Sequence, residues 1–134
     1  MDFVKYISTP KNTLESAPQI TTLKLTRGRL TGGFLFFPSG PAGTLHFLAR
    51  FASHQIYPFN KDESVCLDDC VVPISLGINV ADPPYLIDLV TWNESVLYDH
   101  VLTVCFFLTP KNMRKKILNT MENLFAGTNG YHKP

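Results

Sequence analysis

Four acidic side chains in one short segment are the first candidates for chemistry in this 134-residue chain. Asp62, Glu63, Asp68 and Asp69 belong to the polar segment 60–70. Paired carboxylates can act as general acids and bases, and several carboxylate oxygens from one loop can bind Ca²⁺. The spacing is not that of an EF-hand, however, and the segment contains no Gly. We therefore expect a solvated acidic loop, with a cation site as the alternative.

The three cysteines offer thiol chemistry, but their surroundings argue against it. Cys66 and Cys70 could bind zinc, yet the second ligand pair of a structural zinc site is missing. Asp68 and Asp69 also oppose the thiolate that nucleophilic catalysis needs. Cys105 lies in an apolar run and is interpreted as a small buried hydrophobic residue. Phosphate-loop, Gly-x-Ser-x-Gly and His-Glu-x-x-His motifs are lacking, so we expect no enzymatic activity, no metal and no cofactor.

A third candidate site is the sequence Trp92-Asn93-Glu94, at the end of an apolar run. An aromatic ring can stack on a sugar while amide and carboxylate groups bind its hydroxyls, and Tyr57 and Tyr98 fall near other strand ends. The competing interpretation is that Trp92 belongs to the core. A carbohydrate-binding module is therefore the alternative function, and it requires Trp92 to be exposed in a groove.

The elements that would position these residues are short strands. Alternating or continuously apolar runs, separated by turn residues, cover 22–26, 30–38, 45–51, 53–59, 72–80, 85–92 and 101–108. The last two runs are apolar on both faces, which is typical of central strands. Pro73 favours an edge strand, and Gly32-Gly33 favours a bulge or a close backbone approach. The sequence thus predicts an all-β antiparallel β-sandwich or jelly roll of about seven or eight strands.

Both ends of the chain differ from this central pattern. We expect residues 1–18 to form an arm without a clear strand, docked on its own domain or on a neighbour. Apolar residues spaced by three or four, with Thr109 as N-cap and Pro110 first, predict an amphipathic helix. The predicted segments are an arm over 1–18, a β-sandwich domain over 19–109, the helix over 110–126 and a tail over 127–134. The predicted interface residues lie on the arm and the helix: Phe3, Val4, Tyr6, Ile7, Arg114, Lys115 and Lys116.

Charge is scarce and unevenly distributed. The formal net charge is +1 and only 17% of residues are charged, against about 25% in a typical soluble domain. Residues 60–99 contain one Lys and eight acids, whereas residues 100–134 contain five bases and one acid. These segments can pair within one subunit or between neighbouring subunits. The near-neutral total argues against a specific nucleic-acid-binding protein, and no apolar run has the length of about 18 residues expected of a membrane span.

Residues in turns and at strand ends form an ordered set between about residues 20 and 108. The set comprises Phe36-Phe37-Pro38-Ser39-Gly40-Pro41-Ala42-Gly43, His54-Gln55-Ile56-Tyr57-Pro58, Asp82-Pro83-Pro84-Tyr85, Thr91-Trp92-Asn93-Glu94 and Asp99-His100. In this set the chain resembles small, largely uncharacterised β-sandwich proteins associated with structural genes of tailed phages and other viruses. The resemblance implies a non-enzymatic virion component, such as a minor capsid, decoration or vertex protein.

The partners that this resemblance implies are copies of the same chain and other virion proteins. It implies no catalytic residues. Because residues 1–18 lack the apolar core of a signal peptide, we expect synthesis in the host cytoplasm and localisation in the virion.

Overall fold

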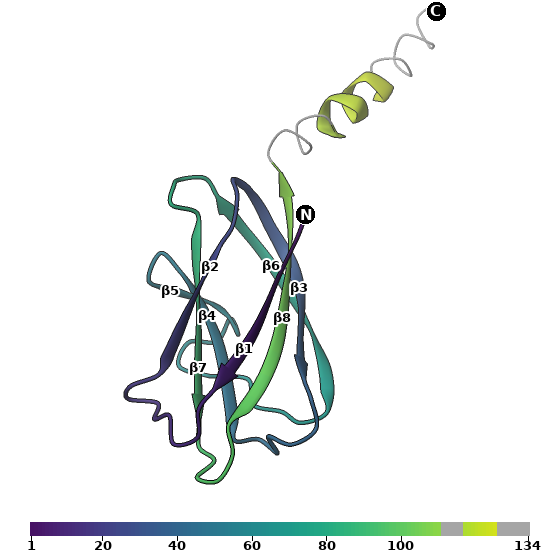
Figure 1. Ribbon diagram of the computed structural model, residues 1–134. Coiled ribbons are helices and arrows are strands. Elements are labelled where there is room, and N and C mark those ends of the chain that lie inside the picture. Colours follow the sequence, from purple (N-terminus) through teal and green to yellow (C-terminus); the bar gives the residue numbers. More distant parts are fainter. Residues whose placement is uncertain (111–116, 126–134) are drawn as a thin grey trace, which may run out of the picture.

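The computed structural model describes residues 1–110 and 117–125, which form eight β-strands and one short helix over 117–125. The strands are β1 (Asp2–Thr9), β2 (Gln19–Lys24), β3 (Gly28–Phe37), β4 (Leu45–Phe51), β5 (His54–Tyr57), β6 (Cys70–Val80), β7 (Leu86–Asn93) and β8 (His100–Pro110). They form two four-stranded sheets, in the orders β1-β8-β3-β6 and β2-β7-β4-β5. The sheets face each other as the two layers of a sandwich (Figure 1), which confirms the predicted fold class.

The connectivity is that of a jelly roll. Antiparallel pairs are nested along the chain, β1 with β8, β2 with β7, β3 with β6 and β4 with β5. The β3–β8 and β4–β7 ladders join these pairs into sheets. Every connection except the β4–β5 hairpin passes from one sheet to the other, so the chain wraps a single core between the two layers.

Successive side chains along each strand point to opposite faces of its sheet, and the apolar ones on the inner faces fill the space between the sheets. The largest are Phe37, Phe47 and Phe106, which come from β3, β4 and β8 and are fully buried. Each such ring stabilises the fold by about 1.5–3 kcal/mol relative to an exposed position. Two predictions of strand position are confirmed: β7 and β8 are central, and β6, which contains Pro73, is an edge strand.

The Gly32-Gly33 pair lies directly next to the bulge that the sequence predicts. The register of β3 shifts between Leu30 and Gly32 against both β6 and β8. A Cβ at Gly33 would lie only 2.8 Å from the carbonyl carbon of Cys105, and still closer to its oxygen, whereas real Cβ atoms stay beyond 3.0 Å. The strands around this bulge therefore approach so closely that a side chain does not fit.

The two ends of the sandwich hold different loops and chain termini, so we call them the lower and the upper end. The lower end is where β8 begins at His100, and the upper end is where β8 ends at Pro110. The N-terminus also lies at the upper end, where the Met1 ammonium donates a hydrogen bond to the Leu108 carbonyl at 2.8 Å. Figure 1 shows the helix 117–125 beyond this upper end.

Two expectations about the chain ends differ from the structure. Residues 2–9 form β1, which pairs with β8 along its whole length, so the prediction that 1–18 contains no clear strand is wrong. Thr109 and Pro110 are the last residues of β8 and not the start of a helix. The helix 117–125 lies within the predicted range, while residues 111–116 and the tail 127–134 lie outside the described residues.

Candidate functional site

The acidic loop uses one of its carboxylates to hold a neighbouring turn. Oδ1 of Asp68 accepts hydrogen bonds from the backbone N–H groups of Gly40 at 2.8 Å and Ala42 at 2.9 Å. These N–H groups, Ala42 first and Gly40 second, hold the pKa of Asp68 below its usual value. In the described part of the chain, no three His, Cys, Asp or Glu side chains are placed to hold a metal ion.

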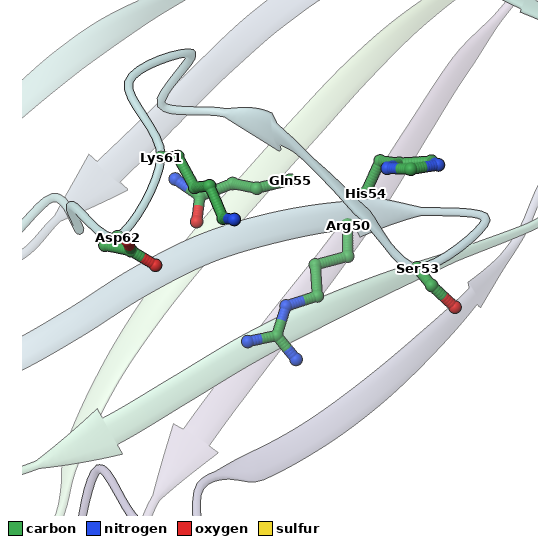
Figure 2. A pocket seen from close by; sticks show the side chains of 6 residues that line it. All are labelled: Arg50, Ser53, His54, Gln55, Lys61 and Asp62. Atoms are coloured by element: carbon green, nitrogen blue, oxygen red, sulfur yellow. The ribbon is translucent and has the colours of Figure 1, made fainter.

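An open polar pocket of about 400 Å³ lies beside the β4–β5 hairpin (Figure 2). Its lining residues are Arg50, Ser53, His54, Gln55, Lys61 and Asp62. The Gln55 amide donates to the carbonyl oxygens of Pro58, Asn60 and Glu63, so it holds the following loop in place. Of the four acidic residues predicted as a group, Asp62 lines this pocket while Asp68 holds the turn. Side chains of both charge signs line the pocket, which gives it no clear selectivity for a ligand.

Trp92, the central residue of the predicted sugar site, is buried. Only 5% of it is exposed, and it packs with Leu48 and Val90. The imidazole of His46, its partner across the β4–β7 ladder, stacks on the indole with ring centroids 4.8 Å apart. A sugar-stacking platform needs an exposed ring face, and Trp92 does not provide one.

Asn93, also predicted as a ligand residue, is committed to internal hydrogen bonds. Its Nδ2 donates to the carbonyl oxygens of Thr9 at 3.1 Å and Tyr98 at 3.0 Å, and its Oδ1 accepts from the Ser95 N–H at 3.0 Å. Beside it, the hydroxyls of Thr9 and Thr91 form a buried hydrogen bond of 2.8 Å. These contacts tie β1 to β7, and therefore one sheet to the other, at the lower end.

Tyr57 does not lie beside Trp92. It is on β5, with β4 between it and β7. Its half-buried ring packs against Phe47, with ring centroids 6.3 Å apart. Burial raises the pKa of Tyr57, as expected for a phenol whose charged form loses solvent. The structure therefore does not bring the predicted sugar-binding residues together.

His46 links two polar side chains, an arrangement that the sequence analysis missed. Its Nδ1 lies 2.8 Å from Oγ of Ser64, and its Nε2 lies 3.2 Å from Oε1 of Glu94 without forming a hydrogen bond. Serine, histidine and carboxylate form the catalytic set of many hydrolases. Here, however, the imidazole lies flat against Trp92 with 15% of its side chain exposed, so a substrate has little access to it. We interpret the Ser64 contact as a tie between β4 and the loop before β6, with the Glu94 carboxylate close by at the end of β7.

The predicted interface residues of the first segment divide between two faces of β1. Ile7 belongs to the core and Phe3 packs against it, whereas Val4 and Tyr6 point outward and are exposed. Arg114, Lys115 and Lys116 lie outside the described residues. Only two of the seven predicted interface residues are thus seen on a surface that a partner could contact.

Val4 and Tyr6 belong to a larger apolar surface on the outside of the β1-β8-β3-β6 sheet. One register row joins Val4, Cys105, Phe34 and Pro73, and the next joins Tyr6, Thr103, Phe36 and Val71. Phe107 lies beside Phe34, with an edge-to-face contact between the rings at 6.2 Å. We call this surface the outer apolar face and define it by Val4, Tyr6, Phe34, Phe36, Val71 and Phe107, each 37–64% exposed.

Cys105 lies beneath this outer apolar face. It is buried, as predicted. Burial, and to a smaller degree the charge of Asp2, raises the pKa of its thiol, which disfavours the reactive thiolate. Cys105 therefore acts as a small apolar residue that supports the rings around it.

The outside of the second sheet, β2-β7-β4-β5, is more polar than the outer apolar face. There, Arg50 on β4 lies opposite Asp88 on β7, and Thr22 on β2 donates to Asp88, so the row is polar. Leu48 and Val90 on that side are buried together with Trp92, and Ile20 and Leu86 are the exposed apolar residues of its described strands β2 and β7. Contiguous exposed apolar patches on soluble proteins mark interaction surfaces, so the outer apolar face is the candidate functional site.

Comparisons of the chain with models of protein families, with curated proteins and with solved structures find no match. Among the described residues, no helix is long and apolar enough to cross a membrane. The function is therefore inferred from the chemistry of the outer apolar face itself.

Proposed function

We propose that this protein is a non-enzymatic structural subunit that assembles with copies of itself, and that it does so in a virus particle. The observation that carries the proposal is the outer apolar face. β3 and β8 are apolar on both sides, yet a two-layer sandwich covers only the side that faces the core. Covering the other side in an assembly would remove from water the 37–39% of Phe34, Phe36 and Phe107 that is still exposed, which is worth roughly 0.5–1 kcal/mol for each ring, about a third of the value for full burial.

The viral setting rests on the resemblance and on the kind of fold. Jelly rolls occur in viral capsid proteins, but also in lectins and cupins, so the fold alone assigns no function. The carbohydrate alternative depended on an exposed Trp92, which is buried, and no three His, Cys, Asp or Glu side chains among the described residues are placed to hold a metal ion. A structural subunit needs only self-complementary or head-to-tail surfaces, and the outer apolar face offers one half of such a contact.

The experiment compares the native chain with two lysine variants by size-exclusion chromatography with light scattering. Phe36→Lys places a charge in the centre of the outer apolar face. Ile20→Lys places the same charge at an exposed apolar position on the outside of the other sheet. We expect the native chain and Ile20→Lys to associate and Phe36→Lys to elute as a monomer with an unchanged circular dichroism spectrum. Equal behaviour of the two variants would contradict the proposal.

A further inference from the structure

We infer that β1 of one copy pairs edge to edge with β1 of a second copy, antiparallel and around a two-fold axis at Val4. The two β1-β8-β3-β6 sheets then continue into one sheet of twice the width, and their outer apolar faces become one surface. This inference rests on the proposed function, because it names the strand by which copies of the chain recognise each other. It adds a self-complementary contact to the apolar one.

β1 has a free edge. It is an outer strand of its sheet, purple in Figure 1, and the longest edge strand without Pro, Gly or a register shift. The Met1 nitrogen donates to the Leu108 carbonyl and the Leu108 N–H donates to the Met1 carbonyl, both at 2.8 Å. Because such pairs alternate along an antiparallel ladder, every second residue of β1 directs its N–H and C=O away from β8. These residues are Asp2, Val4, Tyr6 and Ser8.

The Ser8 carbonyl agrees with this direction, because it accepts a hydrogen bond at 3.0 Å from the Gln19 side chain of β2, in the other sheet. The edge is therefore closed at Ser8. In the described part of the chain, the edge-directed groups of Asp2, Val4 and Tyr6 pair with no other segment. The other edge of this sheet is less suited to pairing, since β6 contains Pro73, which has no N–H.

One register pairs this edge well with a second copy of itself. With Val4 opposite Val4 of the second copy, Asp2 faces Tyr6 and Phe3 faces Lys5, and each of these two pairs occurs twice. The residues with edge-directed groups then exchange about six backbone hydrogen bonds, two for each hydrogen-bonded pair. Lys5 meets the Phe3 ring, which can bind its ammonium by a cation–π contact. No like charges face each other.

The neighbouring registers are worse. A shift of one pair toward the C-terminal end of β1 places Lys5 opposite Lys5, and like charges directly opposite destabilise a sheet. The next shift in this direction needs the Ser8 carbonyl, which Gln19 already occupies. A shift toward the N-terminal end loses a hydrogen-bonded pair, and the next places Asp2 opposite Asp2. The edge is therefore complementary to itself in a single register.

Lys5 selects the second copy over an unrelated strand. It points to the inner side of β1, as Phe3 and Ile7 do, and is half-buried. A charge that points inward on an edge strand disfavours pairing with a further strand. Among the described residues, Lys5 has no ion-pair partner. β1 of a second copy offers it the Phe3 ring, whereas a strand with an aliphatic or basic residue at that place leaves the charge uncompensated.

The ladder alone is a weak contact. Two strands paired in isolation are at best marginally stable in water, so the pair forms where the joined outer apolar faces are also covered in the assembly. Val4 and Tyr6, 62% and 64% exposed, lie on both sides of the new seam. This dependence agrees with the monomer expected for Phe36→Lys.

The test introduces one cysteine into the full chain, in a background in which Cys66→Ser and Cys70→Ser remove the half-buried thiols. Val4→Cys meets its own copy at the two-fold axis with Cα atoms about 5.5 Å apart, a distance that a disulfide spans. Ser8→Cys, at the same edge but beyond the paired register, and Val71→Cys, at the far edge of the outer apolar face, are the matched controls. Non-reducing electrophoresis follows dimer formation under mild oxidation, at concentrations where the background chain associates.

We expect Val4→Cys to form disulfide-linked dimers at least about tenfold faster than both controls. A second pair of variants keeps the native cysteines and tests the register. Tyr6→Lys and Tyr6→Glu each place one charge at the same exposed site, opposite Asp2 of the second copy. We expect Tyr6→Lys to associate roughly tenfold more tightly than Tyr6→Glu in sedimentation velocity, because the pair occurs twice, and the difference to shrink in high salt.

Other outcomes separate this inference from the proposed function. If the chain associates but Val4→Cys is linked no faster than Ser8→Cys, or Val71→Cys is linked fastest, another surface makes the contact and only the inference fails. Equal association of the two Tyr6 variants also overturns the inference, because Asp2 of the second copy is then not opposite. If the native chain is monomeric at every concentration, the proposed function fails as well.

Discussion

Replacing Gly33 by Ala tests the packing around the β3 bulge most sharply. The added Cβ would lie 2.8 Å from the carbonyl carbon of Cys105 and closer still to its oxygen. β3 is held between β6 and β8, and a Cβ at Gly32 would in turn meet the backbone of Ile74 on the β6 side. β3 therefore has no free direction in which to move, and the overlap must be relieved by separating β3 from β8.

The magnitude follows from the hydrogen bonds that this separation breaks. Two or three ladder bonds around the bulge would be lost, and each buried group left without a partner costs about 1–3 kcal/mol. We therefore expect Gly33→Ala to lower the free energy of unfolding by about 3–5 kcal/mol, a large share of the roughly 5–15 kcal/mol that stabilises a domain.

Gly43→Ala is the matched control, measured like Gly33→Ala by urea-induced unfolding. Both glycines have a positive φ, 155° at Gly33 and 83° at Gly43, but a Cβ at Gly43 meets nothing within 4 Å. Only the cost of the left-handed backbone remains, about 1 kcal/mol. If Gly33→Ala and Gly43→Ala lose the same amount of stability, the close approach between β3 and β8 does not limit the fold and the reasoning is refuted.

Three further predictions concern a buried hydrogen bond, the β4–β5 turn and the Asp68 carboxylate. Thr91→Val leaves the buried Thr9 hydroxyl without its partner and should cost about 1–2 kcal/mol, whereas the double variant with Thr9→Val should recover part of that loss; strictly additive losses in urea unfolding would contradict this. Ala52 and Ser53 form the β4–β5 turn with φ values of 50° and 66°, so Ala52→Asn with Ser53→Gly should stabilise the chain by about 0.5–1.5 kcal/mol; an unchanged or lower Tm would count against it. Asp68→Asn should lower stability near neutral pH, and the difference from the native chain should disappear as the pH falls below the ordinary value of 3.8 and through the lower pKa of the folded state; an equal difference at neutral and strongly acidic pH would refute it.

Much of the fold could be predicted because local chemistry and sheet position agree. Pro73 cannot donate to a ladder, and its strand is at an edge. The glycine pair has no side chains, and its backbone lies so close to Ile74 and Cys105 that a Cβ at Gly32 or Gly33 would overlap their carbonyl groups. The runs that are apolar on both faces, 85–92 and 101–108, correspond to the central strands β7 and β8.

The chain ends were predicted less well because pairing across the sheet decides them. In β1, adjacent apolar residues such as Tyr6 and Ile7 place apolar side chains on both faces and hide the period of two. Thr109 and Pro110 match the start of a helix, but Pro110 lies opposite Gly28 in the β3–β8 ladder. Tertiary pairing therefore overrides the local capping signal.

The candidate site was predicted only in part. The sequence indicates that β8 is apolar on both faces, but not which of these faces the sandwich leaves exposed. Nor does it show that His46 would stack on Trp92, because the β4–β7 register brings together residues that are far apart in the chain. The outer apolar face could be recognised only once the order of the strands was known.

The most direct test of the central claim is sedimentation equilibrium of the native full chain from about 1 to 100 µM, a range that reveals contacts of micromolar strength. Our account predicts that the average mass rises with concentration above the 15.1 kDa of one chain, as copies associate through the outer apolar face. A constant mass of 15.1 kDa across the whole range would contradict it.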